Sequence, residues 1–210
     1  MTEVRMTGLT REQKFRLVTG SVVPRPIALV TTLNADASCN AAPFSAFNYM
    51  SDDPPLLAIG FDRYAGESRQ RNGEIKDTLH NILRDGEFVV NMVDEALIRQ
   101  AVACGTDYPF GVSEIGATGL SLTASTLVRV PRVTSAPIAW ECRSWTTLDL
   151  GPARTMLIGE IISMYFQPGL LDETRMKVRA DLLSPVGRLG GPNYAVIRDR
   201  LEIPIKPYPG

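Results

Sequence analysis

The chain has 210 residues, a formal net charge of -1 and one histidine, and these counts exclude several classes of protein. With 22 Lys and Arg residues against 23 Asp and Glu residues, it lacks the basic field that binding to nucleic-acid phosphates requires. Hydrophobic residues make up 44% of the chain and charged residues 21%, a balance typical of one globular domain, here spanning residues 1–210.

The sequence also favours a cytoplasmic protein that does not use its own side chains for covalent chemistry. No window approaches the roughly 18 consecutive apolar residues of a membrane helix, and the N-terminal segment lacks the apolar core of a secretory signal. Cys39, Cys104 and Cys142 are odd in number and widely spaced, which predicts free, buried thiols. With His80 as the one histidine, we expect neither a metal site nor a catalytic triad. An enzyme of this composition would rely on a bound cofactor.

The first predicted element is a helix of one or two turns that follows Thr10. Thr10 and Gln13 have the spacing of a capping box, and an apolar stripe follows from Phe15 to Gly20. Two prolines then precede a β-branched run at residues 27–33, which predicts a strand.

The middle of the chain alternates short strands and short helices. We expect a turn at 34–40, a second apolar stretch at 41–50, a buried strand at 56–61 and a loop at 62–73. A helix is expected to begin at Asp77 or Thr78 as its cap and to end at Gly86, with a strand at 88–93 directly after it. Residues 94–104 predict a second helix capped by Asp94, and residues 109–119 predict turns.

Long β-rich runs dominate the second half. Residues 121–130, 137–150 and 153–166 predict strands that are buried on one or both faces of a barrel, and residues 181–210 predict mostly ordered loop. No internal repeat or linker interrupts the chain. The predicted fold class is therefore mainly β, a β-barrel with short inserted α-helices, in preference to a doubly wound sheet.

Two stretches could hold a ligand. Lys76, Asp77 and Thr78 lie where a helix begins, so backbone N–H groups, an ammonium and a hydroxyl could cradle a phosphate; a solvent-facing capped helix would have the same composition. Pro43, Phe44 and Ser45, with Asn48 nearby, would let the backbone approach a flat ligand; an edge strand protected by proline would look the same. No glycine-rich dinucleotide fingerprint and no P-loop occurs.

The segments RPIALVTT, NAAPFSAFN, SDDPPLLAIGF, KDTLHNI, GEFVVNMV and PVGRLGGPNY occur in an order that resembles the flavin reductase-like branch of the FMN-binding split-barrel families. The resemblance spans residues 25–194 and implies a homodimer of split β-barrels with FMN near the subunit interface. It places the residues from Ala42 to Asn48 along the isoalloxazine and ribityl chain, and those from Lys76 to Thr78 near the phosphate. It also implies that Arg25, Pro26, Arg188 and Tyr194 surround the flavin.

The same resemblance implies an oxidoreductase that passes electrons from NAD(P)H to bound or exchangeable FMN, with a monooxygenase or another redox protein as a possible partner. No residue needs to act as a catalytic acid or base, and either Arg25 or Arg188 would stabilise charge on the reduced flavin. Two other functions stay open: a flavoredoxin-like electron carrier without nicotinamide turnover, and an interaction module that has lost its flavin.

Overall fold

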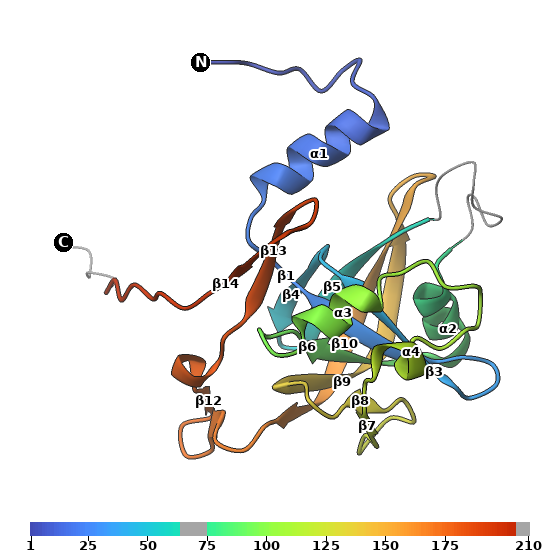
Figure 1. The fold of residues 1–210 in the computed structure, drawn as a ribbon, viewed down its shortest axis with the longest axis vertical. Helices are drawn as coiled ribbons and strands as arrows, with labels where there is room; N and C mark the ends of the chain where they lie inside the picture. Colours follow the sequence, from blue (N-terminus) through green and yellow to red (C-terminus); the bar gives the residue numbers. More distant parts are fainter. Residues whose placement is uncertain (64–74, 205–210) are drawn as a thin grey trace.

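The computed structural model describes residues 1–63 and 75–204, and it confirms the predicted mainly β fold, a split β-barrel with short inserted helices (Figure 1). The helices are α1 (Arg11–Ser21), α2 (Asp77–Asp85), α3 (Ile98–Ala103), α4 (Ile115–Thr118) and the 3-10 helix η1 (Ala180–Leu182). The strands are β1 (Arg25–Pro26), β2 (Ala28–Leu33), β3 (Cys39–Phe44), β4 (Phe47–Asp52), β5 (Pro55–Asp62), β6 (Glu87–Met92), β7 (Leu122–Thr123), β8 (Arg132–Val133), β9 (Ile138–Asp149), β10 (Arg154–Phe166), β11 (Leu171–Asp172), β12 (Lys177–Val178), β13 (Val186–Gly190) and β14 (Asn193–Val196).

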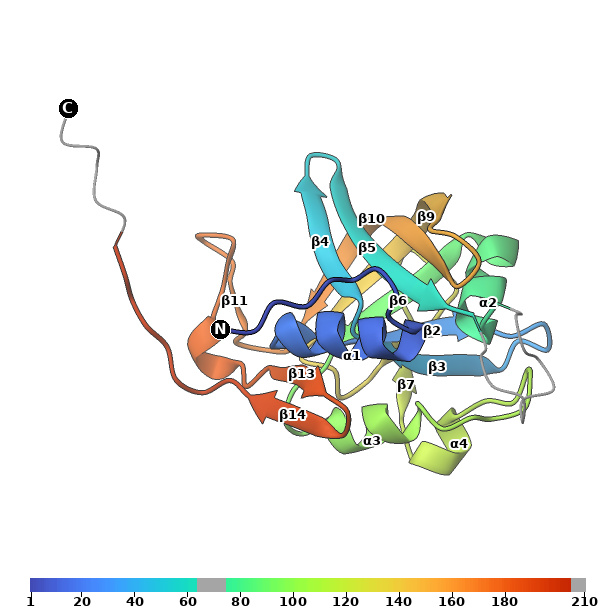
Figure 2. The same cartoon turned by 90° about the horizontal axis from the view of Figure 1, so that it is seen from above.

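The main sheet curls until its two edges meet. Its seven antiparallel strands lie in the order β3-β2-β6-β9-β10-β5-β4, so the edge strands β3 and β4 are consecutive in the chain and are joined by only Ser45 and Ala46 (Figure 2). The Gly60 N–H of β5 donates a hydrogen bond to the Ala46 carbonyl at 2.7 Å, which holds this connection against β5, the strand next to the edge strand β4. The connection between β3 and β4 therefore closes the barrel.

The strand β2 is buried on both faces, which explains why its apolar residues do not alternate with exposed ones. Its Ala28 and Val30 belong to the interior cluster with Phe88, while Leu29 packs outside the barrel with Leu97, just before α3. A strand covered on both sides has no reason to alternate apolar and polar residues. Burial of each large side chain in these clusters stabilises the fold by about 1.5–3 kcal/mol.

The N-terminal helix α1 begins as predicted but is longer. Thr10 Oγ1 accepts a hydrogen bond from the Gln13 N–H at 3.2 Å, and Gln13 Oε1 accepts one from the Thr10 N–H at 2.9 Å, which completes the capping box. The helix runs for 11 residues, none of them buried. It lies outside the barrel, beside β13 and β14 (Figure 1).

Two predicted boundaries between residues 94 and 119 were wrong. The helix α3 covers only Ile98–Ala103, because Asp94 Oδ1 accepts the Leu97 N–H at 3.0 Å and so holds a turn that precedes the helix. The stretch expected to form turns contains the short helix α4.

The predicted strand at 121–130 was also wrong, and Glu141 explains why. Within this stretch only β7 is a strand, and the buried Glu141 carboxylate accepts the N–H groups of Thr126 (2.8 Å), Leu127 (2.6 Å) and Val128 (3.1 Å). Backbone donors that a sheet ladder would use are thus bound by one side chain.

Near the C-terminus, residues 181–210 were expected to be mostly loop, but β13 and β14 form a hairpin there. This hairpin pairs with β1, so that Arg25 lies opposite Arg188 and Pro26 opposite Gly187. The loop expected at 62–73 lies almost entirely outside the described residues; Asp62 itself ends β5. None of the helices in 1–63 and 75–204 has the length and hydropathy to span a bilayer, and the cytoplasmic location stays a prediction.

Candidate functional site

Two adjoining cavities lie where β3, the start of α2 and β13 meet. The first, of about 410 Å³, we call the groove; its lining includes Pro43, Phe44, Ser45 and Arg188. The second, of about 210 Å³, we call the acidic cavity because Asp77, Asp107 and Glu114 line it. Pro43, Phe44, Lys76 and Arg188 line both cavities, so the two form one continuous depression.

Most of the predicted site residues lie around this depression, although they come from segments far apart in the sequence. The groove is lined by Arg25, Pro43, Phe44, Ser45, Lys76 and Arg188, and the acidic cavity adds Ala42, Asp77 and Thr78. Tyr194 lines a small pocket beside Pro43 and Arg188. Pro26 and Asn48 line none of these three cavities, and Asn48 is exposed on β4, where its Oδ1 accepts the Tyr49 N–H at 2.9 Å. That these residues contact a flavin stays a prediction.

The strand β3 supplies the apolar wall of the groove. It is an edge strand, as the edge-strand interpretation held, and proline is tolerated at an edge because a missing N–H breaks no ladder there. Phe44 is buried, and its ring packs against Phe61 with 4.6 Å between ring centroids. Packing in the barrel interior thus fixes the wall that faces the groove.

The helix α2 begins one residue earlier than predicted. Its N-cap is Lys76, whose side chain makes no capping hydrogen bond, and Asp77 and Thr78 are its first two helical residues. The Thr78 hydroxyl is engaged elsewhere, since it accepts a hydrogen bond from Asn40 Nδ2 at 3.0 Å. The predicted end at Gly86 is confirmed, with φ of 73° in the left-handed region that favours glycine.

A buried polar network orients the Thr78 hydroxyl. Asn40 Nδ2 also donates to Thr32 Oγ1 at 3.1 Å, and Asn81 Nδ2 donates to the same oxygen at 3.1 Å and to Asn34 Oδ1 at 2.9 Å. Because the amides are the donors, the Thr78 hydroxyl keeps its own proton to donate. Only 1% of Thr78 is exposed, yet it lines the acidic cavity, where that proton can reach an anion at the helix start.

The geometry fits a phosphorylated planar group. Pro43 and Phe44 offer an apolar wall, while Lys76, the Thr78 hydroxyl and the amides at the start of α2 offer donors for a phosphate. The carboxylates of the acidic cavity oppose that charge, and sequence reasoning missed two of them, Asp107 and Glu114.

Comparison with known proteins identifies the family. A sequence model of the protein family described as the flavin reductase like domain matches residues 19–181. The chain belongs to the flavin reductase-like family. The resemblance noted in the sequence is thereby confirmed, and family membership supports a flavin cofactor.

Solved structures agree with this assignment. The flavin reductase-like chain is 50% identical to the 2-nitrobenzoate 2-nitroreductase NbaA of Pseudomonas fluorescens, over 100% of both chains and with a TM-score of 0.89. It is 32% identical to nitrilotriacetate monooxygenase component B of Bacillus cereus, over 97% of this chain and 98% of that one, also with a TM-score of 0.89. The flavoredoxin of Desulfovibrio vulgaris, at 18% identity, TM-score 0.71 and coverage of 96% and 97%, shows a shared fold alone.

The two arginines that the sequence left open differ in their contacts. The Arg25 guanidinium donates to the carbonyls of Thr19, Val22 (2.9 Å) and Leu189 (3.4 Å), so it ties the end of α1 to β13. Burial, together with the positive charge of Arg188, lowers the pKa of Arg25. Arg188 donates to the Gly191 carbonyl at 3.1 Å and lines all three cavities. Arg188 is therefore the better placed of the two to face a ligand.

The predicted free, buried thiols are confirmed. Burial raises the pKa of Cys39 to about 12 and that of Cys104, which lines the acidic cavity, to about 11. Both thiols are therefore protonated at neutral pH and are poor nucleophiles. His80 is exposed, and its ring contacts Phe110 with 5.4 Å between centroids.

The buried Glu114 yields a testable prediction. Burial is the main cause that raises the pKa of Glu114 above its ordinary value, and the charge of Asp77 raises it further. The Ala41 N–H, which donates a hydrogen bond to Oε2 at 2.8 Å, opposes this rise. When ionised, Glu114 repels a phosphate in the acidic cavity. We expect Glu114→Gln to tighten FMN binding at pH 8 about fivefold, corresponding to roughly 1 kcal/mol of like-charge repulsion. Fluorescence titration of the apoprotein with FMN measures this change.

The effect of Glu114 on folding and on FMN binding depends on pH. The pKa of Glu114 is higher in the folded chain than its ordinary value of 4.5. The free energy of unfolding therefore falls as the pH rises from 4.5 through the folded pKa, and the Glu114→Gln variant lacks this pH dependence. The difference in FMN affinity should also shrink as the pH falls and Glu114 is neutralised. Glu173→Gln, at an exposed acid, is the matched control. Equal affinities of the Glu114→Gln variant and the wild type at pH 8 would contradict the prediction.

Proposed function

We propose that this chain is an FMN-dependent oxidoreductase that takes electrons from NAD(P)H and passes them to bound or exchangeable flavin. The observation that carries the proposal is the convergence of β3, the start of α2 and β13 on one depression with an apolar wall and a cluster of anion-binding donors. Family membership supports the flavin.

The chain's part is to bind and orient, because bound FMN would supply the two-electron chemistry. Lys76 and Thr78 hold the phosphate end, while Pro43 and Phe44 exclude water from one face of the groove. Arg188 places a guanidinium where negative charge would develop.

The neighbours above 30% identity support two kinds of electron acceptor. One is named as a nitroreductase and the other as a component of a monooxygenase. For this chain we therefore consider direct reduction of a nitroaromatic compound and supply of reduced flavin to a partner monooxygenase or another redox protein.

Steady-state oxidation of NADH and of NADPH, each with and without added FMN, tests the function. We expect turnover with at least one nicotinamide, whereas negligible turnover by a flavin-loaded protein would favour the flavoredoxin-like carrier. A purified protein without visible flavin absorbance that also fails to take up FMN would instead indicate an interaction module and overturn the proposal.

We further propose that two copies form a homodimer, with the flavin near their interface. Support comes from large apolar side chains exposed on β4, Tyr49 at 67% and Met50 at 51%. Analytical ultracentrifugation should give twice the chain mass of 23.0 kDa, and a single-chain mass would exclude the dimer.

A further inference from the structure

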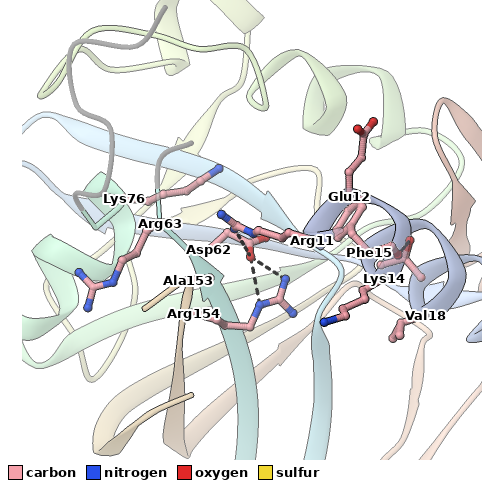
Figure 3. Close-up of a pocket in the computed structure, with 11 residues that line it drawn as sticks. Arg11, Glu12, Lys14, Phe15, Val18, Asp62, Arg63, Lys76, Ala153 and Arg154 are labelled. Atoms are coloured by element: carbon pink, nitrogen blue, oxygen red, sulfur yellow. Dashed lines mark hydrogen bonds and ion pairs between the residues drawn. The ribbon is translucent and has the colours of Figure 1, made fainter. Parts of the chain in front are cut away.

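A further cavity, of about 650 Å³, lies between α1 and the barrel (Figure 3). We call it the α1 cavity. Its lining includes Arg11, Lys14, Phe15 and Val18 of α1 and, on the barrel side, Asp62, Ala153 and Arg154. Apart from Lys76, none of the residues assigned above to the flavin lines it.

The α1 cavity holds more positive than negative charge. In Figure 3 the side chains of Arg11, Lys14, Lys76 and Arg154 approach the space around Asp62, while Glu12 and Arg63 point away. Arg154 donates to Asp62 Oδ1 through Nε at 3.1 Å and Nη2 at 2.7 Å, and Arg11 Nη2 lies 4.0 Å from the same oxygen. Among the described residues that line the cavity, four cations therefore face one carboxylate.

Lys14 is the cation best placed to bind a ligand. Across residues 1–63 and 75–204 no hydrogen bond or ion pair involves its ammonium group, whereas Arg154 is committed to Asp62 and Glu12 pairs with Arg16. An ammonium group beside an excess of positive charge is stabilised by a bound anion.

The wall beside these cations is apolar. Phe15 and Val18 lie three residues apart, on one face of α1, and remain 53% and 52% exposed; Ala153 lies on the barrel side. A simple inorganic anion would leave this wall in water. A planar ring that carries its own anionic group would satisfy the wall and the ammonium together.

The α1 cavity is continuous with the groove. Both are lined by Phe15, Val18, Thr19, Asp62, Lys76 and Arg154. A ring held against Phe15 therefore lies next to the space assigned above to the flavin, which is where a substrate of a flavin site must lie.

We propose that the α1 cavity binds an aromatic carboxylate, with the ring against Phe15 and Val18 and the carboxylate on Lys14 and Arg11. The inference rests on the proposed function, because it names the substrate class of that same site. It concerns binding alone: the carboxylate forms ion pairs, and no covalent bond is made or broken.

Calorimetric titration of the FMN-loaded protein with benzoate and with benzamide tests the proposal, because the two probes share a ring and differ in charge. We expect benzoate to bind about tenfold more tightly than benzamide, and Lys14→Gln to remove that preference. Phe15→Ala should weaken both probes. Arg16→Gln is the matched control, since it removes one positive charge from the same helix at a residue outside the α1 cavity.

Two outcomes overturn the inference: equal affinity for the two probes, or unchanged benzoate affinity in Lys14→Gln. If the second is accompanied by a rise in the KM for NAD(P)H, the cations belong to the nicotinamide site. Lys14→Arg, which keeps the charge, should retain the preference for benzoate and so guards against a misfolded variant. Tight benzoate binding without nicotinamide oxidation would contradict the proposed function and would still support the carboxylate site.

Discussion

Thr78→Val and Lys76→Ala are each expected to weaken FMN binding about tenfold or more. Thr78→Val removes a hydroxyl that Asn40 orients as a donor, and Lys76→Ala removes the ammonium at the N-cap of α2. A hydrogen bond to a charged group contributes roughly 1.5–3 kcal/mol, which corresponds to a factor of about ten or more in affinity. Fluorescence titration of the apoprotein with FMN gives the dissociation constants.

The controls separate phosphate binding from folding. Thr78→Ser keeps the hydroxyl and should bind FMN nearly as well as the wild type, while Thr134→Val changes an exposed threonine far from α2 in the sequence. Asn40→Ala should produce a smaller loss than Thr78→Val, because the hydroxyl remains but is no longer oriented. Dissociation constants that stay unchanged in both Thr78→Val and Lys76→Ala would remove the phosphate from the start of α2.

Gly159→Ala is expected to lower the free energy of unfolding by about 1–3 kcal/mol, the usual cost of overpacking a core. A Cβ atom at Gly159 would lie 2.5 Å from Cζ of Phe88, whose ring is fully buried in the interior cluster. Gly159 is paired on both sides, with Leu57 of β5 and with Ser144 of β9, so its backbone has little freedom to move away. Thermal unfolding should show a melting temperature several degrees below that of the wild type.

Two further variants test that cause. Gly20→Ala, in α1, places its Cβ in open space and should leave stability unchanged or raise it by up to about 1 kcal/mol through helix propensity. Phe88→Leu should lose stability alone, but should lose less when Gly159→Ala is already present, since the shorter side chain relieves the close contact. Additive losses in the double variant would show that the ring is not the obstacle.

Elements set by local chemistry could be predicted from the sequence, and those set by distant contacts could not. The capping box of Thr10, the end of α2 at Gly86 and the long strands β9 and β10 depend on residues close together in the chain. The loop at 124–131 depends instead on the carboxylate of Glu141, and the C-terminal hairpin depends on its pairing with β1.

The residues of the candidate site also divide into those with a local sequence signal and those set by distant contacts. The stretches around Pro43 and Lys76 were recognisable because prolines, small residues and a helix start have a local signature. Asn40 lies in a stretch that predicts a turn, as does Glu114, and neither residue carries a pattern that reveals its partner. Asn40 reaches Thr78 across 38 positions, and Glu114 reaches Ala41 across 73.

The barrel closes where β3 passes into β4, and the residues at that seam also line the groove. A ligand held there contacts both edges of the sheet. Because such a site exists only in the folded chain, ligand binding stabilises the fold by mass action. At a hundred times its dissociation constant, such a ligand raises the free energy of unfolding by about 2.7 kcal/mol. The seam should thus be the part of the chain that proteases attack more readily after the ligand is withdrawn.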